Sequence, residues 1–172
     1  MTSIASEIVS QDARLRLRVA ESGDDPFLRD LFKSVKAAQL ATADLPSAML
    51  DTVVAQQYRA QVAGYAAHCP AAQSLIILRD GSPVGRLLLD RSPTRWHVVD
   101  LALLPGARNA GVGREIMQSV AAAAREQGAG VLSLAVATSN EDAIRFYARL
   151  GFSDIAEAAT ASHRRMELVL AP

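Results

Sequence analysis

The sequence predicts one mixed α/β (α+β) domain, with elements in the order β-α-α-β-β-β-α-β-α-β-β. Three observations lead to this prediction. The 172 residues fit a single domain of ordinary size. Half of the residues are apolar and about a fifth are charged, which is typical of a soluble globular protein. Segments with a two-residue period and segments with a helical period follow one another, separated by proline and glycine turn signals.

The first elements are a strand and two helices. Residues 1–12 show no clear period and are expected to form a loose N-terminal tail, so the domain would cover residues 13–172. Residues 14–20 alternate charged and apolar side chains, which is typical of a half-buried strand. Two helices follow, from about 24 to 36, with Phe27, Leu31 and Val35 on one stripe, and from about 47 to 67.

Three strands and a helix form the middle of the chain. Residues 74–79 and 84–89 have strand character, and the Asp80-Gly81 pair between them is a strong hairpin turn signal. A third strand is expected over 94–104. A helix over 112–127 follows, with Ile116, Val120 and Ala123 facing inward and Gly128 as its left-handed cap.

The C-terminal part continues with an apolar strand over 131–137. Ser139 or Asn140 caps the next helix, which runs to about Leu150 and ends at Gly151. Two last strands are expected over 152–159 and 163–170.

Composition and charge exclude several classes of function. Eighteen basic and eighteen acidic residues cancel, which argues against nucleic acid as the main partner. The longest uncharged run, residues 60–78, contains glutamine, histidine and proline, so no membrane span is expected. The single Cys69 allows no internal disulfide, and no secretory signal is visible, so we expect a cytoplasmic protein. His68 and Cys69 lack a third ligand at metal spacing, so no metal site is expected.

The most informative stretch is the loop between the strand over 94–104 and the helix over 112–127. It carries the spacing Arg108-x-x-Gly111-x-Gly113 and delivers backbone N–H groups to the positive end of a helix, which suits a phosphate-bearing ligand. The spacing is neither that of a P-loop nor that of a dinucleotide fold. It resembles the acyl-CoA pyrophosphate loop of the GNAT superfamily of acyltransferases.

A second segment strengthens the resemblance. Asn140-Glu-Asp-Ala-Ile-Arg-Phe-Tyr-Ala-Arg-Leu-Gly-Phe152 is similar to the second signature of that superfamily, about 30 residues further on. The Asp80-Gly81 hairpin followed by Gly85 is typical of the strand pair before the core motif. The resemblance covers roughly residues 14–170. It implies a single GNAT-like domain with a mixed, largely antiparallel central sheet flanked by helices.

The resemblance implies acetyl-CoA as co-substrate and assigns residues to it. In the loop these are Arg108, Asn109, Ala110, Gly111, Val112 and Gly113, where Asn109 replaces the usual glycine but tolerates a left-handed conformation. In similar proteins the preceding strand separates from its neighbour and frees backbone groups near Leu101 and Leu103. Asn140 either contacts the cofactor arm or caps its helix. Arg108 either pairs with phosphate or braces the loop.

Two side chains are candidates for the chemistry. Similar enzymes use a tyrosine at the position of Tyr147 to protonate the departing thiolate, and a phenol stays protonated at neutral pH. The alternative is a core aromatic residue. His97 lies eleven residues before Arg108, where many relatives have a glutamate base. Strand parity places it with Val99 and Leu101 and places Asp100 on the other face. His97 is either a general base or a half-exposed strand histidine, and deprotonation through water is a third option.

The leading hypothesis is an N-acetyltransferase in which a small-molecule or peptide amine attacks the thioester directly. A non-catalytic acyl-CoA-binding regulatory module and a structural α/β domain are the alternatives. The sequence identifies neither the acceptor amine nor the acyl chain length. Homodimers are common among similar proteins, but no exposed apolar stripe in this sequence demands one.

Overall fold

The computed structural model describes residues 8–41, 46–158 and 160–170. Within them, seven strands and four α-helices follow one another in the order that the sequence predicts. The strands are β1 (Leu15–Val19), β2 (Gln73–Arg79), β3 (Ser82–Arg91), β4 (Arg95–Leu103), β5 (Val131–Ala137), β6 (Ser153–Asp154) and β7 (His163–Val169). The helices are α2 (Asp25–Ala41), α3 (Ser47–His68), α4 (Val112–Glu126) and α5 (Glu141–Arg149), with 3-10 turns η1 (Ser22–Asp24), η2 (Pro105–Ala107) and η3 (Ala156–Ala158).

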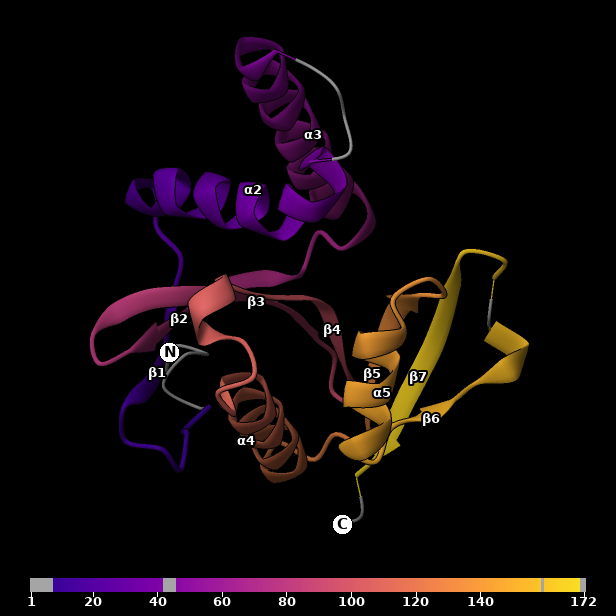
Figure 1. The fold of residues 1–172 in the computed structure, drawn as a ribbon. Helices are drawn as coiled ribbons and strands as arrows, with labels where there is room; N and C mark the ends of the chain where they lie inside the picture. Colours follow the sequence, from indigo (N-terminus) through magenta and orange to yellow (C-terminus); the bar gives the residue numbers. More distant parts are fainter. Residues whose placement is uncertain (1–7, 42–45, 159, 171–172) are drawn as a thin grey trace.

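The strands form a single mixed sheet in the order β1-β2-β3-β4-β5-β7-β6. Every neighbouring pair in this sheet is antiparallel except β4 and β5, which are parallel and are joined through α4. Helices α2 and α3 lie on one side of the sheet and α4 lies on the other (Figure 1). The fold is therefore the largely antiparallel sheet flanked by helices that the sequence predicts.

The main core lies between the sheet and α4. Ile116, Val120 and Ala123 of α4 are buried, as their helical spacing predicts. They belong to one cluster with Leu87 and Leu89 of β3, and with other core residues from β2, β4 and β5. This packing fixes the start of α4, which follows the glycine-containing loop, relative to the strand before it.

Three details differ from the sequence prediction. Helix α2 continues to Ala41, five residues beyond its expected end, because alanine and leucine in this stretch favour helix. Among the side chains of α2 whose burial is described, Leu31 and Phe32 are buried, whereas Val35 is 45% exposed. The strand expected over 152–159 is reduced to β6, because the following alanine-rich residues have low strand propensity and form η3.

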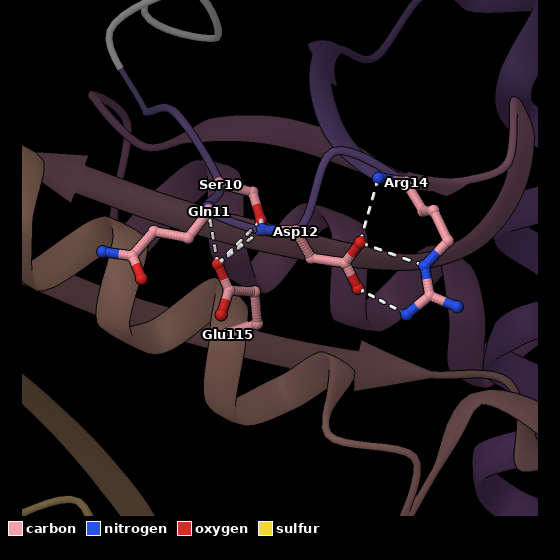
Figure 2. A network of polar contacts seen from close by, with 5 residues as sticks. All are labelled: Ser10, Gln11, Asp12, Arg14 and Glu115. Carbon is pink, nitrogen blue, oxygen red and sulfur yellow. Dashed lines mark hydrogen bonds and ion pairs between the residues drawn. The ribbon is translucent and has the colours of Figure 1, made fainter.

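The segment before β1 is held against α4. Ile8 is buried in the main core cluster. The hydroxyl of Ser10 and the backbone N–H groups of Gln11 and Asp12 donate hydrogen bonds to Oε1 of Glu115, at 2.9, 2.7 and 3.2 Å (Figure 2). Of the expected loose tail, residues 1–7 lie outside the described residues, and residues 8–12 contact the domain in this way. The domain limit at residue 13 stays a prediction.

No helix within residues 8–41, 46–158 and 160–170 combines the length and the apolar character needed to cross a membrane.

Candidate active site

The central feature of the candidate site is a separation of two neighbouring strands. In the described part of the chain, β4 and β5 pair only where Arg95–Val98 faces Val131–Leu134. Beyond this point β4 continues along β3 to Leu103, whereas β5 continues along β7. The two parallel strands therefore splay apart over the second half of β4, as the resemblance to GNAT proteins implies.

The register on the β3 side shows where the backbone of the splayed half points. Leu104 N–H donates to the carbonyl of Val84 at 2.8 Å, and Leu103 faces Gly85. This arrangement makes Leu103 a non-hydrogen-bonded partner in the antiparallel ladder, so its own N–H and carbonyl point away from β3. Leu101, which faces Leu87, has the same orientation two residues earlier. Both backbones point to the side of β4 on which β5 no longer pairs with it.

The loop after β4 leads directly into α4. Asn109 adopts φ 57° and Gly111 φ 80°, both in the left-handed region. Gly111 is the N-cap of α4, which begins at Val112. The first N–H groups of a helix have no acceptor within it, so those of Val112 and Gly113 stand at the positive end of α4. An anionic group bound there would satisfy them.

Glycine is required at the two motif positions, 111 and 113, for different structural reasons. A side chain at Gly111 would meet no atom within 4 Å, so glycine is favoured there by its positive φ. At Gly113, a Cβ would lie 3.3 Å from Cζ of Phe146 and 3.6 Å from Cδ1 of Leu103. Gly113 therefore permits α4, α5 and β4 to approach one another, a reason that the spacing alone does not reveal.

Arg108 braces the loop in this structure. Its Nε donates to the carbonyl of Leu103 at 3.0 Å, which ties the loop to the end of β4. The side chain is exposed. Of the two roles left open by the sequence, bracing is present in the geometry, and pairing with phosphate stays a prediction for the other guanidinium nitrogens.

Tyr147 comes from α5 and packs against the main core. Its ring makes edge contacts with Phe146 and Phe152, with centroids 5.1 and 5.7 Å apart. Burial, and to a lesser extent the negative charge of Asp100, raises the pKa of Tyr147 to about 12. The phenol is thus protonated at neutral pH and lies within electrostatic reach of a carboxylate on the splayed half of β4.

Asn140 is the N-cap of α5. Its Oδ1 accepts a hydrogen bond from the backbone N–H of Ala143 at 3.2 Å, as expected for a cap. A contact between Asn140 and a cofactor arm stays a prediction.

The face assigned to His97 from strand parity is wrong. Leu88 faces Asp100 and Leu89 faces Val98, so Val99 is an extra residue in the ladder, a β-bulge. The bulge reverses the alternation beyond it. His97 and Asp100 therefore share the face that α2 and α3 cover, while Leu101 lies on the α4 face with Val98.

His97 is half-buried, and its Nδ1 lies 2.9 Å from the hydroxyl of Ser133 on β5. Burial, aided by the positive charge of Arg165, lowers the pKa of His97 below its ordinary value. The lowered pKa favours the neutral imidazole, which is the form that accepts a proton. Its catalytic role stays a prediction.

Sequence reasoning missed an ion pair on this face. The guanidinium of Arg86 on β3 binds the carboxylate of Asp100 on β4, and the ring of Tyr65 on α3 lies against it, 5.5 Å from Cζ to the ring centroid. A signal was present, because an arginine inside an apolar central strand is rarely buried without a partner. The β-bulge that places His97 on the same face as Asp100 left no such signal.

Known proteins resemble this chain in sequence and in fold. A model of the acetyltransferase (GNAT) family matches residues 39–152, more than half of the chain. Streptothricin acetyltransferase from Streptomyces lavendulae is 44% identical over 59 residues, which cover 34% of this chain and 31% of that protein. The match thus spans about a third of the length of this curated relative.

Solved structures extend the similarity to most of the chain. Nourseothricin acetyltransferase is 30% identical, with a TM-score of 0.50 over 59% of this chain and 67% of that one. PaiA N-acetyltransferase from Thermoplasma acidophilum, in complex with coenzyme A, is 16% identical, with a TM-score of 0.68 over 90% and 98% of the two chains. An acetyltransferase from Thermus thermophilus is 20% identical, with a TM-score of 0.66 over 95% and 99%. The last two show the likeness of fold.

Proposed function

The chain belongs to the acetyltransferase (GNAT) family, and we propose that it transfers an acetyl group from acetyl-CoA directly to an amine. The observation that carries the proposal is the splay of β4 from β5, which leaves the backbones of Leu101 and Leu103 without a strand partner on the β5 side within the described residues. The same strand runs into the left-handed loop at the start of α4. One continuous segment thus offers amide groups for an extended chain and a positive helix end for a pyrophosphate.

Each group of the site has a part in this proposal. The N–H groups of Val112 and Gly113 bind the pyrophosphate, with Arg108, Asn109, Ala110 and Gly111 shaping the loop. Leu101 and Leu103 hydrogen-bond the pantetheine amides by strand addition. Asn140 fixes the start of α5 beside the arm. The thioester supplies the acetyl group, and the backbone of β4 polarises its carbonyl.

The chemical step requires two proton transfers. The amine nitrogen forms a C–N bond with the thioester carbon as the C–S bond breaks. His97, whose lowered pKa favours the neutral imidazole, takes the proton that the amine must lose. Tyr147, protonated because its pKa is raised to about 12, donates a proton to the departing thiolate. This assignment supports general acid–base catalysis without a covalent enzyme intermediate.

The first acceptor to test is nourseothricin, because two relatives at 30% identity or more are named as acetyltransferases of streptothricin and of nourseothricin. The purified full chain is incubated with acetyl-CoA and nourseothricin, and the acetylated product is detected by mass spectrometry. Mass spectrometry avoids thiol reagents, which would also react with the free Cys69. A peptide with a free N-terminal alanine and simple alkylamines complete the acceptor panel.

A product that forms in proportion to protein concentration supports the proposal. Binding of acetyl-CoA with no acetylation of any amine in the panel would favour the non-catalytic acyl-CoA-binding module. Absence of both binding and turnover would contradict the proposal.

A further inference from the structure

The ion pair between Arg86 and Asp100 lies at the point where β4 separates from β5. Val98 is the last residue of β4 that pairs with β5. The bulged Val99 comes next, and Asp100 follows it. Its side chain is 28% exposed, so solvent and ligands reach it, whereas the Arg86 side chain beside it is buried. The negative charge of Asp100 also helps to raise the pKa of the Tyr147 phenol on α5. The pair thus connects the α3 side of the sheet with the predicted acid.

The arrangement of this pair is unusual for one that only stabilises the fold. Within the described residues, Nε of Arg86 is buried and has no hydrogen-bond partner. Nη2 of Arg86 binds Oδ2 of Asp100, and in the same part of the chain Oδ1 takes no hydrogen bond. A fork-to-fork pair between arginine and carboxylate would use both donors and both oxygens. The geometry instead holds one oxygen and leaves the other available.

Tyr65 of α3 completes the surroundings of Arg86. Its ring lies over the guanidinium, with Cζ of Arg86 5.5 Å from the ring centroid. Arg86 thus contacts α3 through Tyr65 and β4 through Asp100. A carboxylate bound to a cation that is held on two sides keeps one orientation.

We propose that Asp100 binds the amine nitrogen of the acceptor through Oδ1, and that Arg86 is the positioning residue that aims this carboxylate. The inference rests on the proposed transfer to an amine and adds the group that recognises the acceptor. The acceptor enters as an ammonium ion, since alkylamines are mostly protonated at pH 7. Asp100 attracts this charge and holds the nitrogen beside the thioester carbon. The proton then leaves for the base and the nitrogen attacks.

Steady-state kinetics with acetyl-CoA and nourseothricin test the proposal. In the Asp100→Asn variant, which keeps the shape and removes the charge, the KM for nourseothricin should rise roughly 10- to 100-fold. The KM for acetyl-CoA should stay within about threefold of the wild-type value, because Asp100 does not hold acetyl-CoA. Unchanged recognition of nourseothricin by Asp100→Asn would overturn the proposal.

A double-mutant cycle separates positioning from a structural effect. Arg86→Met should also raise the KM for nourseothricin, but in the Asp100→Asn background it should add no further increase. Arg86→Lys, which keeps the cation, should recover part of the wild-type value. Arg18→Met is the matched control, because it breaks the Arg18–Asp24 ion pair next to η1, away from β4. Full additivity of Arg86→Met and Asp100→Asn would show that Arg86 acts on the fold and not through Asp100.

A binding measurement keeps the inference testable if nourseothricin is not an acceptor or if Arg86→Met does not fold. The side-chain carboxyl carbon of Asp100, assigned by its loss in Asp100→Asn, is followed by NMR in the CoA-saturated protein during addition of propylamine. The expected result is a saturable shift with propylamine and none with propanol. No shift with propylamine would overturn the inference, even where acetyl transfer to another amine is detected. A shift without any acetyl transfer would support the binding of the amine by Asp100 and contradict the proposed function.

Discussion

Burial sets the protonation state of the two side chains proposed for the chemistry. Tyr147 and His97 are both half-buried, and in both cases loss of contact with water favours the neutral form. For a phenol the neutral form is the acid, and for an imidazole it is the base. The same physical cause therefore prepares one residue to donate a proton and the other to accept one.

The general-acid role of Tyr147 predicts a large loss of rate in Tyr147→Phe. Removing a positioned acid lowers kcat by roughly 10²- to 10⁴-fold, while acetyl-CoA binding measured by calorimetry stays near the wild-type value. In the wild type, loss of rate through ionisation of Tyr147 occurs near pH 12, because its pKa is raised to about 12. Tyr58→Phe, the same change on α3, is the control and keeps its rate. A Tyr147→Phe enzyme as fast as the wild type would exclude the role.

His97 predicts a pH dependence of stability. Its pKa is lowered in the folded protein by burial and by Arg165, so the unfolded chain binds the proton more tightly. The stability that results is present above the ordinary histidine pKa of about 6.5 and is lost as the pH falls below it. Melting temperatures at pH 7.5 and 5.5 should therefore differ less for His97→Gln than for the wild type. Equal pH dependence of the two melting temperatures would show that folding does not lower the pKa of His97.

At the scale of elements, the segment before β1 and the start of α4 act as one unit. Glu115 receives three hydrogen bonds from residues 10–12 (Figure 2). Its negative charge also lies in the first turn of α4, where it is favourable. The contact steadies the helix end that the proposal assigns to the pyrophosphate.

Glu115→Ala removes these bonds and should destabilise the protein by about 1–3 kcal/mol, because hydrogen bonds to a charged acceptor are lost. The N–H of Asp12 keeps its second bond, to the hydroxyl of Ser10 at 3.1 Å. The melting temperature should fall by roughly 2–4 °C per kcal/mol. Gln118→Ala, an exposed position on the same helix, is the control and should change it by less than about 1 °C. A melting temperature of Glu115→Ala equal to that of the control would contradict a stabilising contact.

Close packing between β3 and β4 depends on Gly85. A Cβ there would overlap the carbonyl oxygen of Ala102 and lie 2.6 Å from Cδ2 of Leu103. Gly85→Ala should therefore lower the free energy of unfolding by about 3 kcal/mol or more, because a backbone carbonyl cannot rotate away from the added methyl group as a side chain can. Gly64→Ala, inside α3 with no atom within 4 Å, should instead stabilise by up to about 1 kcal/mol. Urea unfolding of both variants measures the contrast.

At the scale of the whole molecule, periodicity and turn signals predict the element order and most boundaries. The hairpin at Asp80-Gly81 and the caps at Asn140 and Gly151 are local, so their sequences specify them. The bulge at Val99 is not local, because it arises from how β4 pairs with β3. For that reason parity assigned His97 and Asp100 to opposite faces. The Arg86–Asp100 pair depends on the register between β3 and β4, which is likewise not a local property of the sequence.

The measurement that tests the central claim most directly is a titration of the ¹⁵N-labelled full chain with acetyl-CoA, followed by amide NMR. Binding in the splay predicts the largest shifts at Leu101 and Leu103 of β4 and at Val112 and Gly113 of α4, with little change in β1 or β2. Adenosine alone should not shift the amides of Leu101 and Leu103. Saturating acetyl-CoA that leaves these four amides unmoved would contradict a binding site between β4 and β5.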